Sequence, residues 1–172
     1  MTLNNPHIID RASSDQQPLA LRAVADADQT FLAELYAASR PELDGLRCQG
    51  DVFNQLIAMQ QRVQLAGLLQ NFPAAQQLVI ESNQQPLGRL VVDWGDKDIR
   101  VVDIAVVTSV RRSGVANAVL RALQHAAAAE GLRLSLAVAI SNAPAQALYH
   151  GLGFQREQQD ALFDQLVWQA TP

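Results

Sequence analysis

The sequence predicts a mixed α/β domain of the α+β type, because the spacing of its hydrophobic residues changes several times along the chain. Residues 76–107 contain three short apolar runs separated by turn-forming residues, which predicts an antiparallel meander. From 99 to 140, a strand, a helix and another strand follow one another. This order predicts a right-handed parallel crossover, and therefore a sheet with mixed strand directions.

The first half of the chain is predicted to form one strand and two helices. Alternating apolar residues indicate a strand over 19–24, and Asp26 or Asp28 is suited to cap the helix that follows. Pro41 marks an interruption. A second helix is predicted over about 52–69, and its apolar face consists of Leu56, Met59, Val63 and Ala66.

The second half is predicted to be richer in strands. The helix over 114–130 carries a continuous apolar stripe, and Gly131 is suited to end it. No internal repeat or interdomain linker interrupts this order. The remaining predicted elements are strands over 76–82, 89–94, 99–107, 132–140 and 161–170, and a short helix over 142–154.

Composition limits the class of protein. The length of 172 residues, 49% of them hydrophobic, is typical of one globular domain with its own core. We expect residues 1–18 to form a flexible N-terminal extension and residues 19–172 to form the domain. The net charge of −4 argues against nucleic acid as a partner. A single cysteine, Cys48, and the lack of a signal-like or membrane-spanning run favour a cytoplasmic protein.

The stretch RRSGVANAVL, residues 111–120, places two arginines and a glycine where a helix begins. The first amides of a helix are free to donate, and the helix dipole favours an anion there. Gly114 leaves room for close approach, and Arg111 and Arg112 add charge. Taken alone, the stretch also fits an ordinary solvated helix start.

A second motif decides between these interpretations. The chain resembles the GNAT family of N-acetyltransferases, whose pyrophosphate loop reads Gln/Arg-x-x-Gly-x-Gly/Ala. Arg111, Gly114 and Ala116 occupy the three specified places. The family's second motif, Asn-x-x-Ala-x-x-Leu-Tyr-x-x-x-Gly-Phe, is matched at Asn142, Ala145, Leu148, Tyr149, Gly153 and Phe154. The resemblance covers 99–154 and implies a mixed sheet of about six to seven strands flanked by about four helices.

The resemblance also implies a co-substrate, acetyl-CoA, and a set of residues to bind it. The strand over 99–107 is expected to diverge from the strand over 132–140, with pantetheine in the gap against the backbone of Ile104 and Val106. The Ile104 amide is then placed to polarise the thioester carbonyl. Asn142 either contacts CoA or caps its helix. The pyrophosphate is expected on the loop formed by Arg111, Arg112, Ser113, Gly114, Val115 and Ala116.

The resemblance assigns Tyr149 as the general acid that protonates the leaving thiolate. A packed helix tyrosine is the alternative role. Some family members carry a Glu base where this chain has Ala137. Asp103 is our candidate base, with bonding to neighbouring backbone as its alternative role; Asp93, Glu81 or a water chain are weaker candidates. The histidine spacing suggests no metal site.

The amine acceptor is left open by the sequence. The glutamine-rich region over 40–72 is expected to cover the acceptor side, and small-molecule amines, polyamines, peptide N-termini and lysines all fit. A homodimer is common in the family. A non-catalytic acyl-CoA-binding module is the alternative function. A nucleotide-binding α/β domain is disfavoured by the antiparallel meander.

Overall fold

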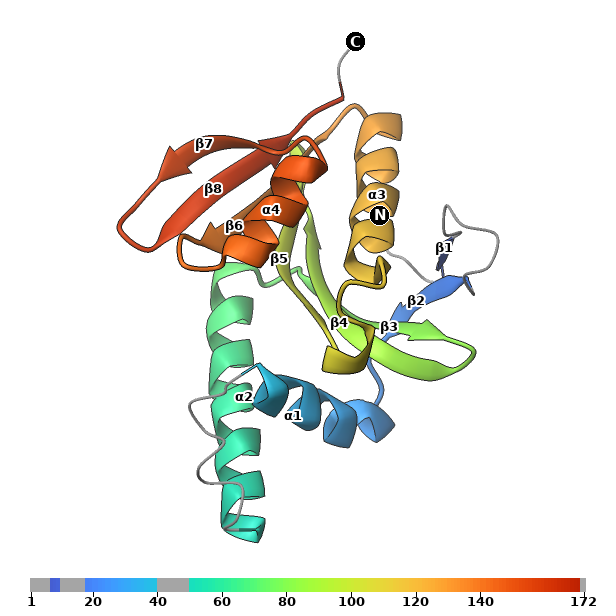
Figure 1. The fold of residues 1–172 in the computed structure, drawn as a ribbon, viewed down its shortest axis with the longest axis vertical. Coiled ribbons are helices and arrows are strands. Elements are labelled where there is room, and N and C mark those ends of the chain that lie inside the picture. The colour runs from blue at the N-terminus through green and yellow to red at the C-terminus, as the bar shows by residue number, and fades with distance from the viewer. Residues whose placement is uncertain (1–6, 10–17, 40–49, 171–172) are drawn as a thin grey trace.

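One twisted sheet forms the centre of the molecule. The structure is a computed structural model that describes residues 7–9, 18–39 and 50–170. Within these ranges the sheet has eight strands in the order β1-β2-β3-β4-β5-β6-β8-β7 (Figure 1). Every neighbouring pair is antiparallel except β5 and β6. The strands are β1 (His7–Ile9), β2 (Leu19–Ala23), β3 (Gln76–Ser82), β4 (Gln85–Trp94), β5 (Asp98–Val106), β6 (Arg133–Ala139), β7 (Gln155–Gln159) and β8 (Phe163–Trp168).

The predicted meander and parallel crossover are both confirmed. Strands β3, β4 and β5 are consecutive antiparallel neighbours. Strands β5 and β6 are parallel and are joined by helix α3 (Val115–Ala129). Helix α3 ends where expected, since Gly131 adopts a positive φ of 66° just beyond it. The predicted fold class is therefore correct, and the additional strands are β1 and β7.

Two layers of helices cover the two faces of the sheet. Helices α3 and α4 (Ala143–Gly151) pack on the main apolar core, which includes Leu90, Val92, Leu134 and Leu136. On the other face, α1 (Gln29–Ala38) contacts β4 and shares a small core with α2 (Asp51–Asn71). Because side chains alternate along β4, the residues between the core positions face α1.

The edge strands β1 and β7 were not predicted. The sequence of β7 is QREQQ and all five residues are exposed, so no apolar alternation identifies it. It is held by backbone pairing to β8. Strand β1 lies within the predicted N-terminal extension and pairs with β2. Residues 1–6 and 10–17 of that extension lie outside the described residues.

Helix α2 docks through a face other than the predicted apolar one. Phe53, Ile57 and Gln61 are its buried residues. Met59 and Val63, on the predicted face, are 60% and 64% exposed. The predicted helix is confirmed, but two of its faces carry apolar side chains. Figure 1 shows α2 running past the end of α1, so only one side of it meets the rest of the molecule.

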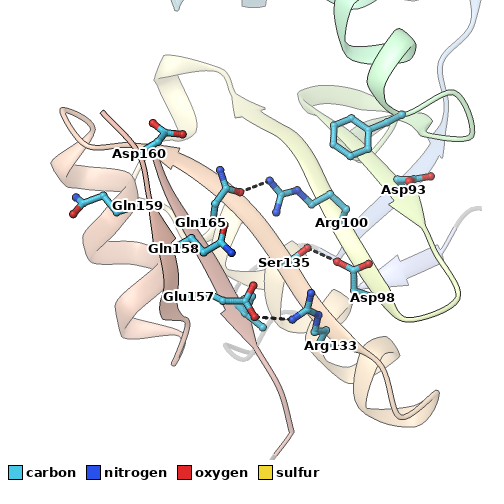
Figure 2. Close-up of a pocket in the computed structure, with 12 residues that line it drawn as sticks. Asp93, Asp98, Arg100, Arg133, Ser135, Glu157, Gln158, Gln159, Asp160 and Gln165 are labelled. Atoms are coloured by element: carbon cyan, nitrogen blue, oxygen red, sulfur yellow. Dashed lines mark hydrogen bonds and ion pairs between the residues drawn. The ribbon is translucent and has the colours of Figure 1, made fainter. Parts of the chain in front are cut away.

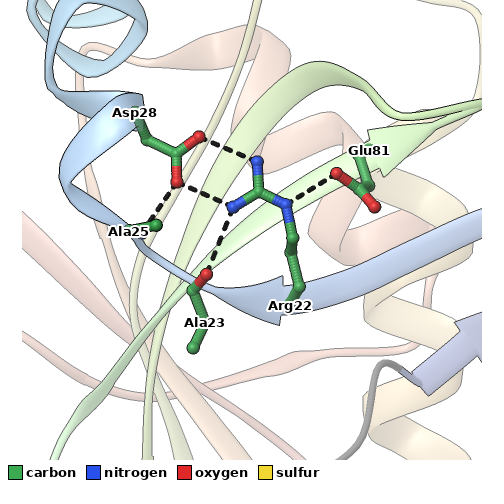
Figure 3. Close-up of polar contacts among 5 residues, drawn as sticks. All are labelled: Arg22, Ala23, Ala25, Asp28 and Glu81. Carbon is green, nitrogen blue, oxygen red and sulfur yellow. Dashed lines mark hydrogen bonds and ion pairs between the residues drawn. The ribbon is translucent and has the colours of Figure 1, made fainter.

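A partly buried ion cluster joins the start of α1 to the sheet. The Arg22 guanidinium donates to both carboxylate oxygens of Asp28, at 2.7 and 2.8 Å, and to Glu81 at 2.7 Å (Figure 3). Asp28 also accepts from the Ala25 amide. Asp28 is the N-cap residue of α1, as predicted, but its side chain makes no capping hydrogen bond to that helix; it bonds instead to Ala25, which precedes the short 3-10 helix η1 (Asp26–Asp28). The Arg22 hydrogen bonds lower the pKa of Asp28 to about 2, against the opposing effect of burial.

Candidate functional site

Strands β5 and β6 separate partway along their length, as expected. Their parallel pairing runs from Asp98 and Arg133 to Val101 and Leu136, and then ends. Both strands continue, β5 to Val106 and β6 to Ala139. A shift in the β4–β5 register leaves Val102 without a partner on β4, as in a β-bulge, which bends a strand locally. The second half of β5 therefore has no strand partner on its β6 side.

A cavity of about 140 Å³ occupies this gap. It is bordered by the diverging strands and by one side of α4. Asn142, Ala145 and Tyr149 are the α4 residues that line it. The Asn142 side chain accepts from the Ala145 amide at 3.2 Å, so it caps α4 while facing the cavity. The strand residues that line the gap are 101–104 on β5 and 136–139 on β6.

Tyr149 is held rigidly at this cavity. The residue is 7% exposed, and its ring meets Phe154 edge-on, with ring centroids 5.8 Å apart. Burial, followed by the negative charge of Asp103, raises the pKa of Tyr149 to about 12. The phenol therefore remains protonated at neutral pH. Among the described residues its hydroxyl has no hydrogen-bond partner, so it can donate to a group in the gap.

Asp103 forms an ion pair that the sequence did not predict. Its Oδ2 accepts from Arg89 Nη2 at 2.6 Å and from Nε at 3.2 Å. Arg89 is 6% exposed, and it lies on β4 two residues before Val91, the residue that pairs with Asp103. The expected alternative, bonding to backbone, is therefore replaced by a salt bridge. Both contacts use Oδ2, which leaves Oδ1 available to accept a proton or hydrogen bond.

Asp103 and Ile104 lie between two cavities. A second cavity of about 150 Å³ opens on the α1 side of the sheet and is lined by Leu35, Tyr36, Gln64 and Arg89, together with Leu32, Ser39 and residues 103–105. The same short piece of β5 also lines the gap toward β6. Two reactants, one in each cavity, would therefore both contact this short piece of β5.

The start of α3 has the features expected of an anion site. Gly114 has a φ of 86°, a conformation that other residues adopt only with strain. Arg111 and Arg112 are exposed and form no ion pair within the described ranges. The Val115 side chain is buried, so only its amide is available to a ligand. The Ser113 hydroxyl donates to the Val110 carbonyl at 2.7 Å.

The other candidate residues are dispersed. Glu81 is engaged by Arg22 and lies outside both cavities bordering Asp103. Asp93 lines a third, larger cavity instead. Ala137 is exposed and lines the gap, at the place where some family members were expected to carry an acid. Ile104 and Val106 lie on the free part of β5, as predicted.

The third cavity was missed by sequence reasoning. It has a volume of about 460 Å³ and a polar lining that includes Asp98, Arg100, Arg133, Ser135 and Gln165 (Figure 2). These residues come from β5, β6 and β8, which are far apart in the chain. The available signal was a run of polar residues alternating with core residues on β5 and β6, which marks one face of the sheet.

No group of three histidine, cysteine, aspartate or glutamate side chains gathers to form a metal site in the described part of the chain. No helix within 18–39 or 50–170 is long and apolar enough to cross a membrane.

Solved structures with the same fold are numerous. The PaiA N-acetyltransferase of Thermoplasma acidophilum, solved with coenzyme A, superposes with a TM-score of 0.62 at 12% identity, covering 88% of this chain and 99% of that one. RimJ of Mycobacterium smegmatis, solved with CoA-disulfide, gives 0.64 at 20% identity, with 90% and 83% covered. A chimera of the Vibrio cholerae spermidine N-acetyltransferase SpeG gives 0.60 at 20% identity, with 88% and 95% covered.

Family membership follows from the sequence itself. No curated protein matches the chain significantly. The model of the acetyltransferase (GNAT) family matches residues 32–154, which is most of the chain and includes the gap, Tyr149 and the start of α3. The protein therefore belongs to the GNAT acetyltransferase family and is an N-acyltransferase.

Proposed function

We propose that the protein transfers an acetyl group from acetyl-CoA to a primary amine by direct attack. One observation carries this proposal. The gap between β5 and β6 holds a buried, protonated Tyr149 and borders Asp103, which also faces a cavity on the opposite side of the sheet. The acyl donor and the acceptor then enter from opposite faces.

Acetyl-CoA is assigned to the gap and to the start of α3. The pantetheine arm lies along the unpaired side of β5, where the backbone of Ile104 and Val106 has no strand partner. The pyrophosphate lies on the amides of residues 112–116, assisted by Arg111 and Arg112. The CoA found in the PaiA and RimJ structures supports this class of co-substrate.

The reaction proceeds without a covalent enzyme intermediate. The lone pair of a neutral amine attacks the thioester carbonyl, and a C–N bond forms. The Ile104 amide donates to the oxyanion, as an oxyanion-hole donor does. The C–S bond then breaks, and Tyr149 gives its proton to the leaving thiolate. With its pKa raised to about 12, Tyr149 is in the donating form throughout the neutral range.

Asp103 is the candidate that receives the amine proton, directly or through a water molecule. Its free Oδ1 is the accepting atom, while Arg89 holds Oδ2 in place. The acceptor is a small-molecule or peptide amine that enters through the α1-side cavity. The alternative function, an acyl-CoA-binding module without turnover, is supported by Ala137 and by the engagement of Asp103 with Arg89.

Calorimetric titration with acetyl-CoA, with ATP and NAD as controls, tests the first half of the proposal. We expect binding of acetyl-CoA only. Release of free thiol in the presence of a panel of primary amines tests the second half. Binding with no thiol release from any amine would favour the acyl-CoA-binding module, and no binding at all would reject both functions.

A further inference from the structure

The 460 Å³ cavity lies on the same face of the sheet as Asp103. In the β4–β5 register, Asp103 is opposite Val91 and Arg100 is opposite Asp93. Val91 and Asp93 are two residues apart, so their side chains point to the same face about 7 Å from each other. Ser135 and Ala137 continue the same face on β6, and they line the large cavity and the gap respectively. The large cavity is therefore a neighbour of the reaction site.

Most of the charged groups in this cavity already have partners. Arg133 donates to Glu157 at 2.8 Å, and the Ser135 hydroxyl donates to Asp98 at 2.6 Å (Figure 2). The Asp160 carboxylate accepts hydrogen bonds from two backbone amides, each at 2.8 Å. Among the described residues, Arg100 has only a neutral partner, Gln165, and Asp93 has none.

Arg100 is a half-buried cation whose hydrogen bonds are incompletely satisfied. Its Nη2 donates to the neutral amide oxygen of Gln165 at 2.7 Å. No carboxylate within the described ranges lies at ion-pair distance from it. Burial lowers the pKa of Arg100; nearby Asp98 opposes this effect and Arg133 adds to it. A guanidinium has five donors in a fork that matches a carboxylate, so an anionic ligand would complete this site.

Asp93 supplies the opposite charge but does not pair with Arg100. The two residues are directly opposite in the β4–β5 register. In Figure 2 the Arg100 guanidinium is directed toward Gln165, and Asp93 lies on the other side of Arg100. The cavity therefore presents a cation and an anion at separate positions. This arrangement suits a ligand that carries both charges, and the nearby carboxylates of Asp98 and Glu157 disfavour a doubly charged phosphate.

We propose that the cavity binds the α-amino-carboxylate end of a diamino acid acceptor, with Arg100 holding the carboxylate and Asp93 the α-ammonium. The inference rests on the proposed acetyl transfer and specifies its acceptor. The side-chain amine of the acceptor then reaches toward Asp103 and the thioester. The spacer of the acceptor has to cover about 7 Å, the separation of same-face neighbours on a strand.

Binding is tested first, because it does not depend on turnover. Protein saturated with CoA is titrated calorimetrically with L-lysine and with cadaverine, which is lysine without its carboxylate. We expect L-lysine to bind at least about tenfold more tightly, as the loss of a charge-assisted hydrogen bond predicts. The substitution Arg100→Gln should remove the difference. Equal binding of the two compounds, or no binding of lysine, would overturn the inference.

Kinetics provide the second test, with Arg133→Gln as the matched control. Arg133 lines the same cavity but is already paired with Glu157. We expect Arg100→Gln to lower kcat/KM for lysine through KM while leaving kcat/KM for cadaverine unchanged. Arg133→Gln should leave the ratio of kcat/KM for lysine to kcat/KM for cadaverine unchanged. Arg100→Lys should recover part of the preference for lysine that Arg100→Gln loses. An equal loss for both substrates would give Arg100 a structural role and reject the inference.

The two proposals fail differently. Acetyl-CoA binding to Arg100→Gln, measured alongside, shows whether that variant is folded. Turnover of other amines with no preference for the carboxylate rejects the diamino acid inference and leaves acetyl transfer standing. Lysine binding without turnover of any amine would reject acetyl transfer and leave the assigned cavity standing.

Discussion

At the scale of single residues, the site depends on how a few groups are held. Tyr149 is rigid because it is buried against Phe154, and its proton is retained because burial and Asp103 disfavour the phenolate. The sequence motif identified Tyr149. It did not reveal Arg89, because an arginine in an apolar strand carries no local pattern and its partner is fourteen residues away. Such long-range pairing follows from register alone.

Replacing Tyr149 with phenylalanine tests its proposed role as the acid. The change removes one hydroxyl and keeps the packed ring, so the core is preserved. We expect kcat to fall by about 10²-fold, the lower end of the range for general acid catalysis. The acetyl-CoA dissociation constant should stay nearly the same. Turnover equal to that of the unmodified protein would remove Tyr149 from the mechanism and leave it as a packing residue.

A substitution at Gly114 tests the anion site. Glutamate there adds a negative charge beside the proposed pyrophosphate and strains the left-handed backbone. We expect Gly114→Glu to weaken acetyl-CoA binding by at least about tenfold. Gly114→Asn is the matched control, since asparagine tolerates this backbone conformation without adding charge. Equal affinities in the glutamate and asparagine variants would argue against a phosphate at this helix end.

At the scale of elements, the second half of the chain was predictable because its patterns are unambiguous. The predicted strand over 76–82 is β3, and the apolar stripe of α3 faces the core. In α2, by contrast, two sets of apolar residues are each spaced for a helix face, and local spacing cannot choose between them. Tertiary contact with α1 decides which face is buried. Strand β7 could not be predicted from the sequence because it has no apolar face at all.

A pair of substitutions on α2 tests which face is buried. Ile57 is 2% exposed and Val63 is 64% exposed. We expect Ile57→Ala to lower the free energy of unfolding by about 2–4 kcal/mol, as for other buried large-to-small changes. Val63→Ala should change it by less than about 0.5 kcal/mol. Urea unfolding of both variants is the measurement, and equal losses would mean that both faces are covered in solution.

The Arg22–Asp28–Glu81 cluster connects β2, η1 and β3 and should make stability depend on pH. The pKa of Asp28 is about 2 in the folded protein, below its ordinary value of 3.8. A depressed carboxyl pKa stabilises the fold above the unfolded value, and this contribution is lost as pH falls from about 4 to about 2. We expect Asp28→Asn to cost about 2 kcal/mol at pH 7 and much less near pH 2. A cost that is independent of pH would contradict the ion-pair explanation.

At the scale of the whole molecule, the sequence motifs predicted the candidate site at the gap between β5 and β6, but they did not predict the large cavity. The motif at 111–116 and the motif at 142–154 are both local, and each predicts a helix start near the gap. The large cavity is lined by Asp93, Arg100, Ser135 and Gln165 from four strands, which no local pattern connects. Only the strand order and register bring these residues to one surface. The proposed recognition of the acceptor thus depends on the folded sheet and not on a local motif.

The separation of β5 from β6 has a consequence for the product of the reaction. In the proposed complex, the unpaired side of β5 contacts the pantetheine arm, and this arm is the same before and after acetyl transfer. Contacts that are equally strong with acetyl-CoA and with CoA do not favour the release of CoA after the reaction. We therefore expect free CoA to inhibit competitively against acetyl-CoA, with a similar dissociation constant, and CoA release to limit the turnover rate. A burst of acetylated product in the first turnover, measured by rapid quenching, would show that acetyl transfer is faster than the release of CoA.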